Sequence, residues 1–267
     1  MQAAIAFRSG GSSLRRCLPS LVSLVLVAAG LAPVAAQSQS VQKTPDFSGA
    51  WTTYPGRSKG PPPDPKLAAP PPTPLQLKAQ YAGPYEAKRA AQRESDRRGE
   101  PLANASTECV PNGMPQMMFP IYPLEILQTR GQVTIIAEAM SQVRRIYLNQ
   151  PQAKMEDVPP EYFGHSVGHW EGDTLVVDTI GVKEEVLSYQ DTPHSDQMRI
   201  KERFRLVAPD ILHDQITIED PVTLEKPWTF TFAYKRQAGY QMLEYVCENN
   251  REYVDDKGVT RMKLQDH

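Results

Sequence analysis

Alternating apolar and polar positions dominate the chain from residue 108 onward. Runs such as GQVTIIAEA, QVRRIYL and TLVVDTIGV are rich in Val, Ile, Thr and aromatic residues, and turn-forming residues separate them. None has a helical period, and a period of two is typical of strands with one buried face. Because the connections leave no room for crossover helices, we expect antiparallel strands that close into a barrel or fold into a sandwich. We favour a mainly β protein, with an antiparallel β-barrel over residues 108–267.

A different pattern precedes this barrel. Residues 46–54, DFSGAWTTY, are strand-like and could supply a first barrel strand. The prolines of residues 55–74 prevent helix and sheet ladders and favour an extended surface segment. The next stretch is dense in Ala, Gln, Lys, Arg and Glu, which favours one or two short helices broken at Pro84. Residues 37–107 are therefore predicted to form a proline-rich, partly helical N-terminal extension, a strap outside the core.

Residues 1–36 have the layout of a signal peptide. Arginines precede the apolar core LPSLVSLVLVAAGLAP, and small residues at Val34 and Ala36 suit a signal peptidase. The apolar run is shorter than a membrane-spanning helix requires. We expect cleavage after Ala36, a periplasmic or secreted mature protein, and no stable membrane span.

Export gives meaning to the two cysteines of the mature chain, Cys109 and Cys247. In an oxidising compartment, an isolated pair far apart in sequence is most simply a disulfide. The alternative is two free thiols, one of them a nucleophile.

Metal-binding signatures are weak. No CxxC spacing occurs, which argues against a zinc–thiolate site. His165 and His169 are four residues apart, and in an extended strand this places them about 13 Å apart, too far for one metal ion. We expect neither a metal nor a cofactor.

Strand alternation places ionisable groups on faces that should be buried. In residues 196–207, DQMRIKERFRLV, Asp196 and Glu202 share a face with Met, Ile, Phe and Leu. A buried carboxylate is costly unless it is paired, hydrogen-bonded or protonated. Glu202 is therefore either a functional group or the partner of an inward arginine. Arg144 and Arg145 must point to opposite faces, so one of them could pair with Glu202 or bind a ligand carboxylate.

Aromatic and methionine side chains indicate a candidate ligand surface. The strand KPWTFTFAYKR has an aromatic face that would line a packed core or a ligand cavity. The segment ECVPNGMPQMMFPIYP is irregular but apolar, and we expect it to plug or rim a barrel mouth. The predicted ligand-binding set is Met117, Arg144, Arg145, His165, Trp170, Trp228, Phe230 and Tyr234.

The loop YQDTPHSDQ, residues 189–197, carries the candidate chemistry. His194 lies close to Asp196, and a histidine beside a carboxylate is the basic unit of acid–base catalysis. The alternative is a plain turn capped by Asp191 and Ser195. The predicted catalytic set is His194, Asp196 and Glu202.

Two resemblances add to this reading. Gly49 and Gly168 each precede a tryptophan by two positions, and this Gly-x-Trp pairing resembles the strand entry of lipocalin-like barrels. The blocks GHSVGHWEGDTLVVDTIGV, PHSDQMRIKERFR and LEYVCENNR together resemble an uncharacterised family of exported bacterial proteins, with the same block order over residues 108–251. The family is expected to carry arginine where this chain has His169. The resemblance implies export and a shared architecture, expected to be lipocalin- or calycin-like, but it assigns no catalytic residue.

Charge narrows the class of partner. Lys plus Arg number 29 and Asp plus Glu 31, and a net charge of −2 gives no support for nucleic acid. Ionisable groups on apolar faces favour a cofactor-independent lyase, isomerase or hydrolase acting on a partly aromatic or apolar small molecule. The alternatives are a non-catalytic periplasmic carrier and an envelope protein whose partner docks on the basic face from Arg199 to Arg205. The sequence leaves the oligomeric state open.

Overall fold

The structure, a computed structural model, describes residues 44–56, 64–100, 102, 109–119, 121–186, 188–247 and 252–262. All of them belong to the unit Gln42–His267. The predicted signal peptide and its cleavage after Ala36 lie outside the described residues. No helix in these ranges is both long enough and apolar enough to cross a membrane.

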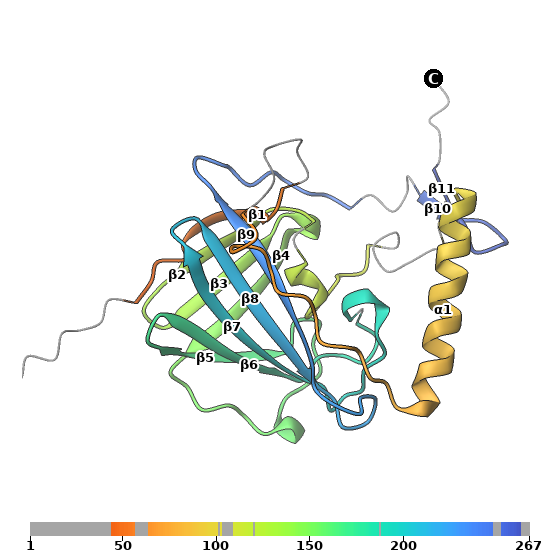
Figure 1. The fold of residues 1–267 in the computed structure, drawn as a ribbon, viewed down its shortest axis with the longest axis horizontal. Coiled ribbons are helices and arrows are strands. Elements are labelled where there is room, and N and C mark those ends of the chain that lie inside the picture. The colour runs from red at the N-terminus through yellow and green to blue at the C-terminus, as the bar shows by residue number, and fades with distance from the viewer. Residues whose placement is uncertain are drawn as a thin grey trace, which may run out of the picture. The chain divides into compact units, whose positions relative to one another are not determined.

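Nine strands of the described chain close into a barrel, which confirms the predicted mainly β architecture (Figure 1). The strand supplied by residues 46–54 is the first of them, and it pairs with the last strand to close the circuit. The strands are β1 (Gly49–Thr53), β2 (Leu124–Gln128), β3 (Gln132–Ala137), β4 (Gln142–Leu148), β5 (His165–Glu171), β6 (Thr174–Ile180), β7 (Arg199–Ala208), β8 (Ile211–Glu219) and β9 (Trp228–Gln237).

The prediction that all neighbouring strands are antiparallel was wrong at one place. β4 and β5 run parallel, with Ile146 opposite Ser166, whereas the other neighbours in the barrel are antiparallel. A parallel pair needs a connection of about a dozen residues or more, and residues 149–164 supply it. Gln152 fastens this connection, since its Nε2 donates to the carbonyl of Asp178 at 2.9 Å.

The barrel interior follows the alternation of the sequence. Along β7, buried and exposed side chains alternate from Ile200 to Arg205, so Glu202 points inward as predicted. Asp196 does not share that face, because β7 begins only at Arg199. The residues before it form a turn in which the Met198 N–H donates to the Ser195 carbonyl at 3.1 Å, and Asp196 is exposed.

The irregular methionine-rich segment is packed into the barrel as expected. It contains a short 3-10 turn, η2 (Gln116–Met118), and Met114, Met117 and Met118 are buried in the core. The hydroxyl of Tyr234, on β9, donates to the Met118 carbonyl at 2.6 Å. We call residues 112–119, 121 and 122 the plug.

The proline-rich segment lies as a strap along β9. The Thr73 N–H donates to the Thr229 carbonyl at 2.8 Å, and the indole N–H of Trp228 donates to the Thr73 carbonyl at 3.1 Å. Leu77 then forms a bridge with Leu224. These contacts agree with the predicted surface strap.

The strap leads into one helix of 20 residues, α1 (Ala79–Arg98), which corrects the prediction of short helices broken at Pro84. Pro84 lies in the second turn and removes one backbone hydrogen bond, but the residues that follow it favour helix. The Tyr85 side chain is buried, and its hydroxyl donates to the Gln190 carbonyl at 3.3 Å. This bond ties α1 to η5 (Tyr189–Asp191).

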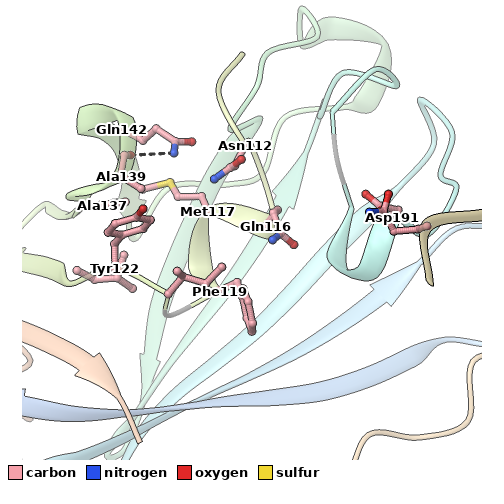
Figure 2. A pocket seen from close by; sticks show the side chains of 12 residues that line it. Asn112, Gln116, Met117, Phe119, Tyr122, Ala137, Ala139, Gln142 and Asp191 are labelled. Carbon is pink, nitrogen blue, oxygen red and sulfur yellow. Dashed lines mark hydrogen bonds between the residues drawn. The ribbon is translucent and has the colours of Figure 1, made fainter. Parts of the chain in front are cut away.

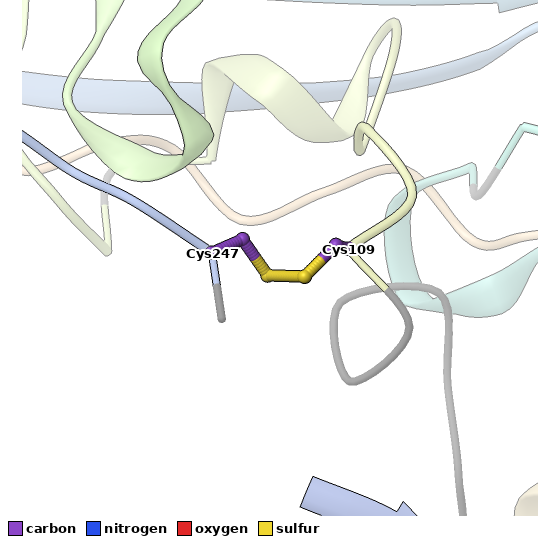
Figure 3. The surroundings of a disulfide bond; sticks show 2 residues. All are labelled: Cys109 and Cys247. Atoms are coloured by element: carbon purple, nitrogen blue, oxygen red, sulfur yellow. A yellow bond between two sulfur atoms is a disulfide. The ribbon is translucent and has the colours of Figure 1, made fainter. Parts of the chain in front are cut away.

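The predicted disulfide between Cys109 and Cys247 is confirmed (Figure 3). It joins the segment before the plug to the segment that follows β9, across a separation of 138 residues. The predicted strand QMLEYVCE is wrong, because residues 241–247 join no ladder. Glu138 holds this segment instead, accepting from the Leu243 N–H at 3.0 Å and the Tyr240 hydroxyl at 2.6 Å.

The barrel therefore ends at Gln237, before the predicted boundary at residue 267. Beyond the disulfide, β10 (Glu252–Val254) and β11 (Thr260–Met262) pair with each other in a separate two-stranded sheet.

Candidate functional site

A buried ion pair occupies the barrel interior. Arg144 on β4 and Glu202 on β7 are 1% and 0% exposed, and they form two hydrogen bonds, one of 2.8 Å between Nη1 and Oε1. The Arg144 guanidinium also donates to Ser166 Oγ at 3.1 Å and to Thr179 Oγ1 at 2.9 Å. Arg144 is thus the inward arginine of the predicted pair, and Arg145 is exposed.

A second carboxyl group lies in the same interior. Asp214 on β8 is 0% exposed, and neither of its oxygens has a hydrogen-bond partner in the described structure. Burial raises its pKa well above the usual range; the negative charge of Glu202 raises it further, and Arg144 opposes this. The barrel therefore favours the protonated, neutral form of Asp214. Tyr234 has a raised pKa chiefly for the same reason, burial.

These interior groups are built into packing. Across the sheet, Asp214 lies opposite Phe204 and Phe232, and Glu202 lies opposite Val177 and Ile216. All three nitrogens of the Arg144 guanidinium donate to side chains of the barrel itself, which is how a buried charge is tolerated in a core.

A cavity of about 290 Å³ lies at the end of the barrel where β2 begins and β3 ends (Figure 2). We call it the mouth cavity. The plug forms one wall, the ends of β2, β3 and β4 form another, and α1 and η5 each contribute one residue. Its lining is Gln92, Asn112, Gln116, Met117, Phe119, Ile121, Tyr122, Leu124, Ala137, Ala139, Gln142 and Asp191.

Backbone constraints shape the plug wall of this cavity. Gly113 has φ +64°, and a Cβ there would lie 2.5 Å from the Tyr162 carbonyl, so glycine is required. The Gln142 side chain fixes the facing wall, because its Nε2 donates to the Ala139 carbonyl at 3.0 Å.

η5, which contributes Asp191 to the cavity, has an unusual backbone conformation. Gln190 and Asp191 are consecutive non-glycine residues with φ of 58° and 57°, a conformation that is costly for most residues and tolerated best by Asn and Asp. Tyr189 anchors this turn, with its ring centroid 4.5 Å from that of Phe230 and 5.7 Å from that of Phe119. The strained turn therefore holds Asp191 at the cavity edge.

His194 lies in a neighbouring cavity of about 370 Å³, lined by α1 and by residues 184–186, 188 and 191–194. We call it the helix cavity. The His194 side chain is buried, with Nε2 at 2.9 Å from the Val186 carbonyl and Nδ1 at 3.2 Å from the Ser195 carbonyl. The predicted partners lie elsewhere, since Glu202 is paired in the barrel and Asp196 is exposed.

A structural carboxylate organises the loop that was predicted to be catalytic. Asp220 accepts hydrogen bonds from the backbone N–H and the hydroxyl of Ser195 and from the N–H groups of Val222 and Thr223. Burial alone would raise the pKa of Asp220, but these hydrogen bonds lower it. These hydrogen bonds support the alternative interpretation of this loop as a turn. The residue that caps the turn is Asp220, whereas Asp191 and Ser195 had been expected to do so.

The predicted ligand-binding residues are dispersed. Met117 lines the mouth cavity, whereas Trp228 and Phe230 are buried in the aromatic cluster around Tyr189. Trp170 packs on Phe47 with ring centroids 5.2 Å apart. His165, another residue of the predicted set, stacks on Tyr147 on the outer face of the barrel.

The basic face of β7 is neutralised by its neighbours. Arg199 pairs with Asp178, Arg203 with Glu171 at 2.9 Å, Arg205 with Asp173 at 3.0 Å and Lys201 with Glu219 at 2.7 Å. His169 also pairs with Glu171. Among the residues with described positions, no group of three His, Cys, Asp or Glu could hold a metal ion.

Sequence reasoning missed most of the mouth cavity and Asp214. Asp214 carried a usable signal in the sequence, since strand alternation places it on the same face of β8 as the apolar residues Leu212 and Ile216. The amide residues Gln92, Asn112, Gln116 and Gln142 carried none, because they come from a helix, an irregular plug and a strand end.

A scan against models of known protein families and a search of curated proteins found no match to this chain. The resemblance to exported bacterial proteins therefore stays a prediction, and the function has to be inferred from the geometry.

Proposed function

We propose that this is an exported small-molecule-binding protein whose ligand occupies the mouth cavity. The observation that carries the proposal is the cavity itself, assembled from four separate parts of the chain at one end of a closed, packed barrel. Its volume of about 290 Å³ is near the lower end of the range for small-molecule sites. Sites of this kind commonly lie at the mouths of β-barrels.

The lining indicates the type of ligand. Phe119, Tyr122 and Met117 offer aromatic and polarisable apolar surface. Four side-chain amides, from Gln92, Asn112, Gln116 and Gln142, offer donors and acceptors at the edges. A partly aromatic or apolar molecule with a polar edge suits this mixture.

Binding is favoured over acid–base catalysis by the placement of the ionisable groups. Glu202 is held by Arg144 inside the barrel, and Asp196 is exposed. His194 lines a different cavity and faces two backbone carbonyls. A lyase, isomerase or hydrolase would need an acid and a base within reach of one substrate, and these three side chains are dispersed.

Export is supported by the Cys109–Cys247 disulfide, since such bonds persist in oxidising compartments. The signal-like layout of residues 1–36 points the same way. We place the mature protein in the periplasm or outside the cell.

Native mass spectrometry of the protein collected from the periplasm tests this function. We expect a bound organic molecule that denaturation releases. Ala139→Phe, which fills the mouth cavity from its half-buried rim, should abolish the bound mass, and Ala153→Phe, at an exposed position, should keep it. A wild-type protein with no bound mass, or equal loading of both variants, would contradict the proposal.

A further inference from the structure

We infer that the ligand of the mouth cavity carries a positively charged amine, and that Asp191 binds this group. The inference rests on the proposed function, because it names the ligand class of the same site. Four features support it: the charge of the cavity, the lack of an ion-pair partner for Asp191 among the described residues, the backbone that presents Asp191, and the polar and aromatic groups of the lining.

The mouth cavity has a one-sided charge. Of the twelve described residues that line it, Asp191 alone carries a formal charge, and the others are amides, apolar residues and one tyrosine. A carboxylate in a recess whose described lining holds no cation attracts a cationic group and disfavours an anionic one. Carboxylate ligands, which an arginine would have bound, are therefore disfavoured here.

The Asp191 carboxylate is also available. Among the described residues, no Lys, Arg or His nitrogen lies within ion-pair distance of it. Lys88 shares the helix cavity with Asp191, but it is exposed, and two acids, Glu184 and Glu185, line that cavity as well. On the mouth side of η5 no other described lining residue is charged, and on the helix side the acids outnumber Lys88.

The turn that presents this carboxylate has a costly backbone, chiefly at Gln190, because Asp tolerates the left-handed region. Asp191 has φ 57° and follows Gln190 at φ 58°, and such strain persists where the surrounding structure enforces it, often at binding sites. Here the enforcing contacts are the Tyr189 ring cluster and the bond from Tyr85 to the Gln190 carbonyl. Figure 2 shows Asp191 on one side of the cavity and Tyr122 and Gln142 on the other, with Gln116 between them.

The remaining lining suits an ammonium group. An ammonium has three N–H donors, and Gln116 Oε1 is a buried acceptor without a hydrogen-bond partner in the described structure. The rings of Phe119 and Tyr122 add faces that attract cations. A protonated amine on an apolar body would therefore find an opposite charge at Asp191, a hydrogen-bond acceptor at Gln116 and an aromatic face.

Calorimetry on matched ligand triplets tests this inference. Each triplet keeps one scaffold and changes the end group, for example phenethylamine, 2-phenylethanol and phenylacetate. We expect the amine to bind at least about ten-fold more tightly than the alcohol, the scale of one charge-assisted hydrogen bond. The Asp191→Asn variant should abolish that preference, and it suits the site because Asn tolerates the left-handed backbone. Asp157→Asn, at an exposed position, is the matched control and should keep the preference.

The outcomes separate the two claims. Binding that Ala139→Phe abolishes but that shows no preference for the amine would overturn this inference and leave the proposed function standing. A preference for amines that survives in Asp191→Asn would also overturn it. If no member of the triplet set binds the wild-type protein, this inference fails, and the bound mass in native mass spectrometry decides the proposed function.

Discussion

Asp214 is a fully buried carboxyl group whose pKa is raised, chiefly by burial and further by the charge of Glu202, against the opposing effect of Arg144. The folded protein therefore keeps this proton at pH values where the unfolded chain has already released it. Stability from such a group is fully present below the ordinary Asp pKa, about 4. It is lost as the pH rises from there towards the folded-state pKa.

The Asp214→Asn variant keeps the shape of the side chain and removes the titration. Inside this pH window the two states of the wild type differ by one proton, so its free energy of unfolding falls by about 1.4 kcal/mol per pH unit relative to the variant. Urea unfolding of both proteins in small pH steps from acid to neutral measures this slope.

Asp210→Asn, at an exposed position in the turn between β7 and β8, controls for the substitution itself and should change stability by less than about 0.5 kcal/mol. If the stability difference between Asp214→Asn and wild type stays flat from acid to neutral pH, the reasoning is refuted. Such a result would mean that the folded barrel holds Asp214 ionised, with solvation or a partner that the packed interior does not provide.

Three further perturbations follow from the same structure. Glu202→Gln should leave the Arg144 charge buried without its partner. We expect urea unfolding to show a loss of stability of about 3–5 kcal/mol. A loss below about 1 kcal/mol would show that the pair behaves like a surface ion pair. Replacing both cysteines, Cys109→Ser with Cys247→Ser, should lower the unfolding midpoint, because the bond spans 138 residues and is worth about 5 kcal/mol in the chain-entropy model; an unchanged midpoint would contradict this. Asp220→Asn should cost about 1–3 kcal/mol at neutral pH. Because the pKa of Asp220 is lowered, that cost should shrink as the pH falls below about 4, and a cost that is constant with pH would argue against an ionised Asp220.

The barrel and its interior pair were largely predictable from the sequence. A period of two identifies both the strand and its buried face, which placed Glu202 inside before any coordinates. The two neighbouring arginines could not both point inward, so alternation also required one of them to be available to Glu202. Export made the Cys109–Cys247 bond the simplest pairing.

The errors arose where long connections or local hydrogen bonds override periodicity. The connections were judged to leave no room for crossover helices, yet residues 149–164 carry the chain back so that β4 and β5 run parallel. In the sequence, Asp196 continues the alternating pattern of β7. In the structure, residues 195–198 form a turn, so that the strand begins only at Arg199.

The mouth cavity could not be predicted, because its residues share no segment and no period. Gln92 comes from α1, Gln142 from β4 and Asp191 from η5. Amide side chains give no pattern in a sequence, and their convergence depends on how the plug seats in the barrel. Met117 was found because an apolar but irregular segment has to be buried.

The methionine methyl groups can report directly on where a ligand binds. Met117 lines the mouth cavity, Met155 lines a separate surface recess, and Met198 is buried in the barrel core. Methyl NMR spectra of the labelled protein are recorded before and after adding a small-molecule extract of the producing cells. A ligand in the mouth cavity should shift the Met117 resonance and leave those of Met155 and Met198 in place. A shift confined to Met155, or no shift at all, would contradict the proposed binding site.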